Sequence, residues 1–199
     1  ACRTVVGWRT AGLVADDFIL RVNLSARQLD QAGLARDVAD VLSTVGLPPS
    51  RLCLEVTETA LMRDVRAGMA ALTELHRVGV QLAIDDFGTG YSSLSYLKRF
   101  PIDVLKVDRS FVDGLPGEAH DVAITTAILD LARSLELEVT AEGVETVGQR
   151  DALIELGCKR AQGYLFARPM PAEDLVRHLM QQQASATSAA EPVAAANPG

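Results

Sequence analysis

Short hydrophobic runs alternate with amphipathic segments along most of the chain. Continuous apolar runs predict strands at residues 18–22, 52–56, 80–84, 102–107, 138–141 and 159–161. Apolar residues at helical spacing predict helices at residues 34–44, 64–77, 94–98, 121–134, 148–156 and 171–180, and residues 2–9 resemble the end of another helix. Strand and helix therefore alternate about six times, which is typical of βα units around a parallel sheet.

Two α/β architectures fit this alternation: an open doubly wound sheet and a (β/α)₈ TIM-like barrel. The strands are apolar throughout, as expected where both faces of a sheet are covered. Six βα units are too few for a complete barrel, but the chain opens within a helix, so we expect the first strands to precede residue 1. The prediction is an incomplete barrel over residues 1–180, followed by a disordered Ala/Gln/Ser/Pro-rich tail at 181–199.

Composition narrows the classes of partner. The 199 residues are 48% hydrophobic and carry a formal net charge of −7, without a cluster of Lys and Arg. This argues against a nucleic-acid polymer or an anionic membrane as the main partner. No apolar run approaches a membrane span of roughly 18 residues. The three cysteines, Cys2, Cys53 and Cys158, are scattered and odd in number, which favours a reduced, cytoplasmic protein.

Polar side chains recur where each predicted strand becomes a loop. They are Asn23, Glu55, Asp85, Asp86, Lys106, Asp108, Glu142, Glu145 and Gln162. In a barrel of parallel strands all the carboxyl ends meet on one face, so these residues would form an acidic cluster containing one lysine. Oxygen ligands around one point suit one or two divalent cations, and a pair of such ions is the usual arrangement for activating water against a phosphodiester.

The positions suggest a division of roles. Asp85 is best placed to bridge two ions, with Asn23 and Glu55 completing the first site and Asp86, with Glu142, serving the second. Lys106 would orient the attacking hydroxide or neutralise charge on the phosphorane, and Glu58 and Glu145 would support the site from one step further out. Taken singly, each residue also has a structural explanation: Asn23, Glu55 or Glu58 as a cap, Glu142 and Glu145 as first-turn acids, and Lys106 as the partner of Asp108. A Schiff-base role for Lys106 is a further alternative, but neighbouring carboxylates would keep the lysine charged.

These residues lie in motifs that resemble the EAL domain, the family of bacterial cyclic di-GMP phosphodiesterases. The motifs are Asn23-Leu24-Ser25, Glu55-Val56-Thr57-Glu58, the run from Asp85 to Leu94 that begins Asp-Asp-Phe-Gly, Leu105 to Phe111, Ala141 to Glu145, and Gln162-Gly163-Tyr164. They occur in order over residues 1–180, and as a set they are highly specific.

The resemblance implies a modified (β/α)₈ barrel that opens cyclic di-GMP to linear pGpG with two Mg²⁺ or Mn²⁺ ions. It implies metal ligation by Asn23, Glu55, Asp85, Asp86 and Glu142, catalytic roles for Lys106, Glu58 and Glu145, and substrate contacts from Gln162, Asp108 and Arg109. It also implies a homodimer through the Asp86–Leu94 loop and the helix after it, and an upstream regulatory domain. The Glu-Ala-Leu signature would precede residue 1, so the alternative is a catalytically degenerate module that binds cyclic di-GMP or a protein partner.

Overall fold

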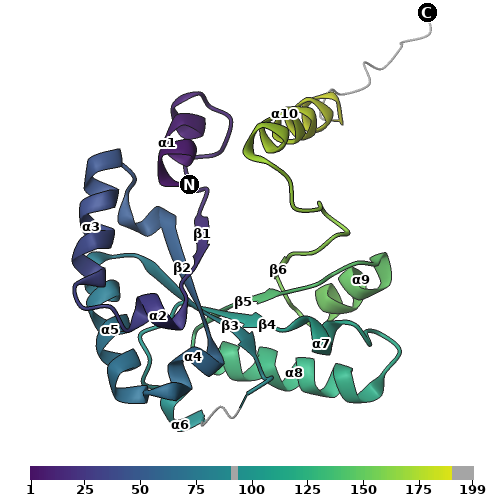
Figure 1. Cartoon of the computed structure of the whole chain (residues 1–199). Helices are drawn as coiled ribbons and strands as arrows, with labels where there is room; N and C mark the ends of the chain where they lie inside the picture. The colour runs from purple at the N-terminus through teal and green to yellow at the C-terminus, as the bar shows by residue number, and fades with distance from the viewer. Residues whose placement is uncertain (91–93, 190–199) are drawn as a thin grey trace, which may run out of the picture.

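The computed structural model describes residues 1–90 and 94–189 and shows one parallel sheet with helices along its outer face (Figure 1). The strands are β1 (Leu20–Asn23), β2 (Leu52–Thr57), β3 (Gln81–Phe87), β4 (Val104–Val107), β5 (Glu138–Ala141) and β6 (Arg160–Ala161). The helices are α1 (Cys2–Thr10), α2 (Ala26–Leu29), α3 (Leu34–Val45), α4 (Glu58–Arg63), α5 (Val65–Val78), α6 (Leu94–Leu97), α7 (Arg109–Val112), α8 (Ala119–Ser134), α9 (Val147–Glu155) and α10 (Ala172–Ala189), with a 3₁₀ turn η1 at Pro49–Arg51.

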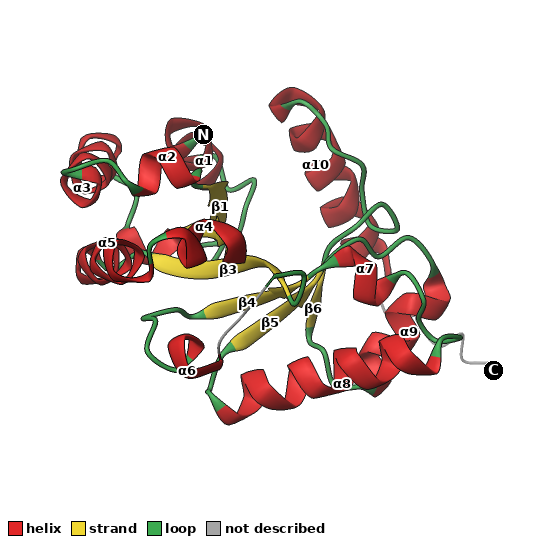
Figure 2. Cartoon of the chain, turned by 60° about the horizontal axis from the view of Figure 1, so that its bottom comes forward, coloured by secondary structure: helices red, strands yellow, loops and turns green. Residues whose placement is uncertain are grey.

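The strand order decides between the two architectures. The six strands lie in the order β1-β2-β3-β4-β5-β6, and every neighbouring pair is parallel. A doubly wound sheet reverses its strand order at a switch point, whereas a barrel adds each new strand to the same side. The sheet curls as it proceeds (Figure 2), and among the described residues no strand joins β6 to β1. The predicted incomplete barrel is therefore confirmed.

The two faces of the sheet have different chemistry. Residues that point outward, such as Leu54, Ile84 and Leu105, are buried in the main hydrophobic core beneath the helices. Helix α5 packs against β3, and α8 packs against β4 and β5. The inward-pointing residues Cys53 and Ala83 belong to a second, small cluster inside the curl. Beyond this cluster, toward the carboxyl ends of the strands, the inner face becomes polar.

Local signals account for the short helices that follow three of the strands. The N-cap residues of α2, α4 and α7 are Ser25, Thr57 and Asp108, respectively. The side chain of each accepts a hydrogen bond from a backbone N–H in the first turn of its helix. These helices turn the chain sharply away from the strand end. The carboxyl edge of the sheet is thereby left open to side chains from several strands.

The C-terminal helix is longer than the sequence analysis predicted. We expected the helix to end at Met180 and the tail to be disordered, but α10 continues to Ala189. The extension is rich in Ala and Gln, which have high helix propensity, although they offer little to a core. Residues 190–199 lie outside the described part of the chain. None of the helices in the described part is both long and apolar enough to traverse a lipid bilayer.

Candidate active site

The strand-end residues of the first four strands point to one side of the sheet. Asn23 and Glu55 are register partners on β1 and β2. Asp85 pairs with Thr57, two residues beyond Glu55, and therefore projects from the same face. Lys106 follows Leu105, the β4 partner of Ile84, just as Asp85 follows Ile84 on β3. These side chains converge at the carboxyl edge, where the sequence analysis placed the site.

Lys106 lies at the centre of this group. Its Nζ contacts Glu55 Oε2 at 2.7 Å, Asp85 Oδ1 at 2.8 Å and Glu142 Oε1 at 2.5 Å. The lysine is 2% exposed. Since an ammonium has three N–H donors, each of them has a carboxylate acceptor. The alternative pairing of Lys106 with Asp108 is wrong, because the Asp108 carboxylate instead caps α7 through the backbone N–H of Ser110.

Burial and charge act in opposite directions on this cluster. Burial lowers the pKa of Lys106, but the hydrogen bonds that its ammonium donates to Asp85, Glu142 and Glu55 outweigh burial and leave its pKa above the ordinary value. Burial raises the pKa of Glu142, and the nearby Lys106 offsets part of that rise. Three carboxylates share one ammonium, so the cluster keeps a negative charge that favours an added cation.

Asp86 carries a fourth carboxylate to the same edge. Its backbone has a positive φ of 53°, and β3 changes register with β4 between Ile84 and Phe87. This irregularity brings consecutive aspartates to one side of the strand, where their side chains would otherwise alternate. Burial raises the pKa of Asp86, and the charges of Asp85 and Asp108 raise it further.

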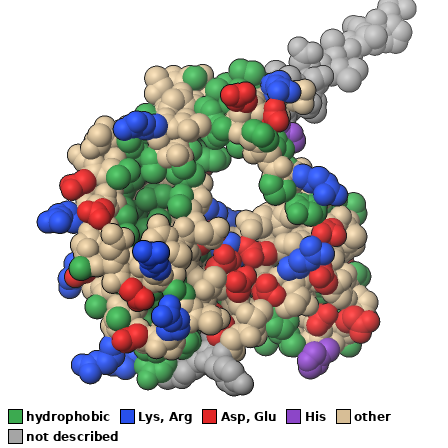
Figure 3. Space-filling view, viewed as in Figure 1, with side chains coloured by type: hydrophobic (Ala, Val, Ile, Leu, Met, Phe, Trp, Pro, Cys, Tyr) green, Lys and Arg blue, Asp and Glu red, His purple; other side chains and the backbone are tan. Residues whose placement is uncertain are grey.

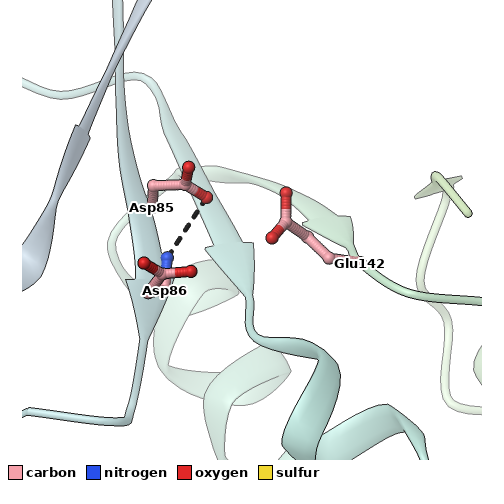
Figure 4. Close-up of side chains that lie close together, drawn as sticks. All are labelled: Asp85, Asp86 and Glu142. Carbon is pink, nitrogen blue, oxygen red and sulfur yellow. Dashed lines mark hydrogen bonds between the residues drawn. The ribbon is translucent and has the colours of Figure 1, made fainter. Parts of the chain in front are cut away.

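Asp85, Asp86 and Glu142 fit a hard divalent cation. Each can offer one carboxylate oxygen such that all these atoms lie within 4.8 Å of one another. Figure 4 shows the three carboxylates turned toward a common space from β3 and from the loop after β5. An all-oxygen donor set is the kind that Mg²⁺, Mn²⁺ and Ca²⁺ prefer. The donors present therefore fit the predicted metal at this position.

Glu58 fixes the loop that follows Asp86. Its side chain is 1% exposed, and its Oε2 accepts a hydrogen bond from the backbone N–H of Gly88 at 3.0 Å. A Cβ placed on Gly90 would lie 2.5 Å from Glu58 Oε1, so the backbone passes directly over the carboxylate. Glu58 thus contacts the loop rather than the acidic cluster. Residues 91–93 of the predicted Asp86–Leu94 dimer loop lie outside the described residues.

Arg109 and Glu145 form a separate ion pair at the edge of the site. Arg109 Nη1 lies 3.0 Å from Glu145 Oε1, and Arg109 Nε donates to Asp113. The aliphatic part of the Arg109 side chain crosses Gly143, which has a φ of +70° and no room for a Cβ. The guanidinium itself lies between Glu145 and Asp113, and the Arg109 side chain remains 52% exposed.

A cavity of about 480 Å³ opens next to the cluster on this side. It is lined in part by Arg109, Glu142, Gln162, Tyr164 and Arg168. Gln162 Nε2 donates to Glu142 Oε1 at 2.6 Å, and the Arg168 guanidinium lies 4.7 Å from the centre of the Tyr164 ring. Acidic side chains gather along one edge of the opening in the molecular surface (Figure 3). The lining of the cavity therefore combines acidic side chains with two arginines and an aromatic ring.

Arg21 is the site residue that sequence reasoning missed. It lies two residues before Asn23 on β1, and its Nη1 is 3.3 Å from Glu55 Oε1 and 3.8 Å from Cys53 Sγ. An arginine inside an otherwise apolar strand, in phase with the strand-end residue, was the available signal. Its partner could not be named, because that required the register between β1 and β2.

The comparisons with known proteins bear directly on this arrangement. The family model described as the EAL domain matches residues 1–169. The chain belongs to the EAL domain family. The match covers every strand of the sheet and all the strand-end residues of the cluster. The predicted family is therefore confirmed, and the six strands are part of the barrel of an EAL domain.

Two curated relatives of this EAL domain come from Pseudomonas aeruginosa. The bifunctional diguanylate cyclase/cyclic di-GMP phosphodiesterase MucR is 49% identical over 176 residues, which cover 88% of this chain and 25% of MucR. The cyclic di-GMP phosphodiesterase NbdA is 46% identical over 171 residues, which cover 86% of this chain and 22% of NbdA. The chain thus spans about a quarter of the length of these larger relatives.

Solved structures of EAL domains have the same fold. The structure titled PaMucR phosphodiesterase, c-di-GMP complex, superposes with a TM-score of 0.83 at 49% identity, covering 88% of this chain and 70% of that one. The EAL domain of Mycobacterium smegmatis DcpA gives a TM-score of 0.85 at 43% identity, covering 91% of this chain and 81% of that one. The Klebsiella pneumoniae BlrP1 manganese/cy-diGMP complex gives a TM-score of 0.77 at 32% identity, covering 84% of this chain and 42% of that one.

Proposed function

We propose that this EAL domain hydrolyses cyclic di-GMP to linear pGpG with two Mg²⁺ or Mn²⁺ ions. The observation that carries the proposal is the convergence of Glu55, Asp85, Asp86 and Glu142 around Lys106 at the carboxyl edge of the sheet. The relatives named as cyclic di-GMP phosphodiesterases and the neighbour titled as a manganese/cy-diGMP complex support the substrate and the ions.

The ligand set divides between two ions. Asp85, Asp86 and Glu142 would hold one ion, since their oxygens already lie close together. Asn23 and Glu55, which are register partners, would hold the other together with Asp85. When bound, the ions supply Lewis acidity and lower the pKa of a bound water.

The remaining residues would position water and substrate. Lys106 would orient the attacking water with an N–H and neutralise charge that builds on the phosphorus oxygens. Glu58 would keep the Gly88 loop over the site, and Glu145 would hold Arg109 in place. Gln162, Asp108 and Arg109 would contact the nucleotide along the cavity beside Glu142. Water adds to one phosphorus and the 3′ oxygen leaves, so one phosphodiester opens and no other reactant is needed.

Three further features belong to this proposal. The chain would form part of a larger protein with an upstream regulatory domain. The greater length of MucR and NbdA, of which the chain covers about a quarter, supports this. Two copies would pair through the Asp86–Leu94 loop and the helix after it. The protein would act in the cytoplasm, consistent with three free cysteines.

Turnover in matched variants tests the proposal. Purified protein is incubated with cyclic di-GMP and Mn²⁺, and products are separated by chromatography. We expect pGpG from the unaltered chain and at least about a hundredfold less from Asp85→Asn. Asp16→Asn serves as the matched control, because that side chain is 97% exposed. Turnover that survives chelation, or equal turnover in Asp85→Asn, would contradict the proposal, whereas binding without turnover would favour a regulatory binding module.

A further inference from the structure

Glu55 is held by two cations at once. Its Oε1 lies 3.3 Å from Arg21 Nη1, and its Oε2 lies 2.7 Å from Lys106 Nζ. The Glu55 side chain is 6% exposed, so neither ion pair is open to bulk solvent on the carboxylate side. Each oxygen of this proposed metal ligand therefore already faces a positive charge.

The other acidic side chains are arranged differently. Asp85, Asp86 and Glu142 form the group whose oxygens lie within 4.8 Å of one another, and within the described part of the chain Glu55 does not belong to it. Lys106 contacts one oxygen each of Asp85 and Glu142, which leaves the second oxygen of each carboxylate outside that ion pair. One ion position is thus formed in advance, while the position that includes Glu55 is not.

We propose that Arg21 and Lys106 occupy both carboxylate oxygens of Glu55, so that the two ions bind in a fixed order. The first ion binds at Asp85, Asp86 and Glu142. The second binds more weakly, because it must draw Glu55 from both cations. Arg21 is then a positioning residue that acts through Glu55. The inference rests on the proposed two-ion site and adds to it an order of loading.

Arg21 is the better of the two cations to perturb. The Arg21 side chain is 24% exposed and contacts Glu55 alone among the acidic residues of the site, whereas the Lys106 side chain is buried and holds three carboxylates. Removing the guanidinium leaves Glu55 paired with Lys106, so no buried charge loses its last partner. The loss of one charge-assisted hydrogen bond should ease the capture of Glu55 by roughly tenfold in affinity.

Manganese binding, followed by calorimetry and by the electron paramagnetic resonance of free Mn²⁺, tests the order. For the unaltered chain we expect two ions, the second bound at least about tenfold more weakly. Arg21→Met should tighten the second step about tenfold and leave the first unchanged. Arg66→Met, at an exposed arginine on α5, should change neither step. Equal affinities in the unaltered chain, or an unchanged second step in Arg21→Met, would overturn the inference; a merely structural role for Arg21 would weaken both steps.

A measurement on the unaltered protein does not depend on any variant. The chain has three lysines, Lys98, Lys106 and Lys159, so the ¹⁵N ammonium signals are few. The first equivalent of Mg²⁺ binds Asp85 and Glu142, which contact Lys106, so it should shift the Lys106 signal once, and the second equivalent should shift it again as Glu55 departs. The absence of a further shift between the first equivalent and saturation would refute the order of loading. A protein that binds no divalent ion would overturn the proposed function as well.

Discussion

Replacing Lys106 by Met tests how strongly the carboxylate cluster depends on its internal cation. The methionine side chain is similar in length, but it carries no charge. Lys106 is 2% exposed and contacts Glu55, Asp85 and Glu142 at 2.5–2.8 Å. Without the ammonium, the folded protein can restore the balance of charge by taking a proton onto one carboxylate.

The cost of that proton sets the expected loss of stability. A carboxyl group with an ordinary pKa of about 4.3 costs about 3.7 kcal/mol to protonate at pH 7, and about 1 kcal/mol at pH 5. The first value agrees with the roughly 3–5 kcal/mol lost when one partner of a buried ion pair is removed. With an m-value of about 2 kcal/mol per molar urea, the unfolding midpoint should fall by about 2 M at pH 7 and about half a molar at pH 5.

Urea unfolding in the presence of a chelator, followed by circular dichroism at both pH values, measures this loss. Lys159→Met is the matched control, because Lys159 is exposed and lies outside the cluster. The loss of stability should be larger at pH 7 than at pH 5, and this direction is the decisive observation. A loss below about 1 kcal/mol at pH 7, or an equal loss at pH 5, would refute the reasoning that buried carboxylates depend on Lys106.

Other substitutions test separate parts of the account. Gly90→Ala should lower the free energy of unfolding by about 1–3 kcal/mol, because its Cβ would meet Glu58 Oε1, whereas Gly148→Ala makes ordinary contacts and should not. Asp86→Asn should raise the melting temperature of the metal-free protein at pH 7, because the pKa of Asp86 is raised and folding disfavours its charged form. The gain should vanish in acid, where Asp86 is protonated in both states, and an unchanged melting temperature at pH 7 would contradict the prediction. Burial raises the pKa of Cys53 to about 11, so its thiol should resist Ellman's reagent at pH 8 until the protein is unfolded; rapid labelling of Cys53 in the native Cys2→Ser variant, with Cys53 identified as the labelled residue, would contradict this.

The strands and the strand-end residues were predictable because their signals are local. The apolar run before Asp85 marks β3, and parallel strands bring such ends together whatever their separation in the chain. The short helices α2, α4 and α7 were missed because four to six residues are too few for helical periodicity to show. Helix α10 passes Met180 because propensity, rather than an apolar pattern, favours its last turns.

The partners of the charged residues depend on register and were harder to predict. Lys106 could face Asp108 or the interior of the curl, and the structure gives it the carboxylates of β2, β3 and the loop after β5. Arg21 could be read as a surface residue until the pairing of β1 with β2 placed it beside Glu55. Likewise, strict alternation would place Asp86 on the face opposite Asp85, and the irregularity in β3 alters this.

The central claim is that this chain adds one water to one phosphodiester of cyclic di-GMP with the help of divalent ions. Hydrolysis in H₂¹⁸O with Mn²⁺, followed by mass spectrometry of the nucleotide, tests it most directly. The account predicts pGpG carrying one ¹⁸O atom on its 5′ phosphate, and no such product with a chelator or in Asp85→Asn. Unchanged cyclic di-GMP from folded, metal-loaded protein, or a labelled product without divalent ions, would contradict it.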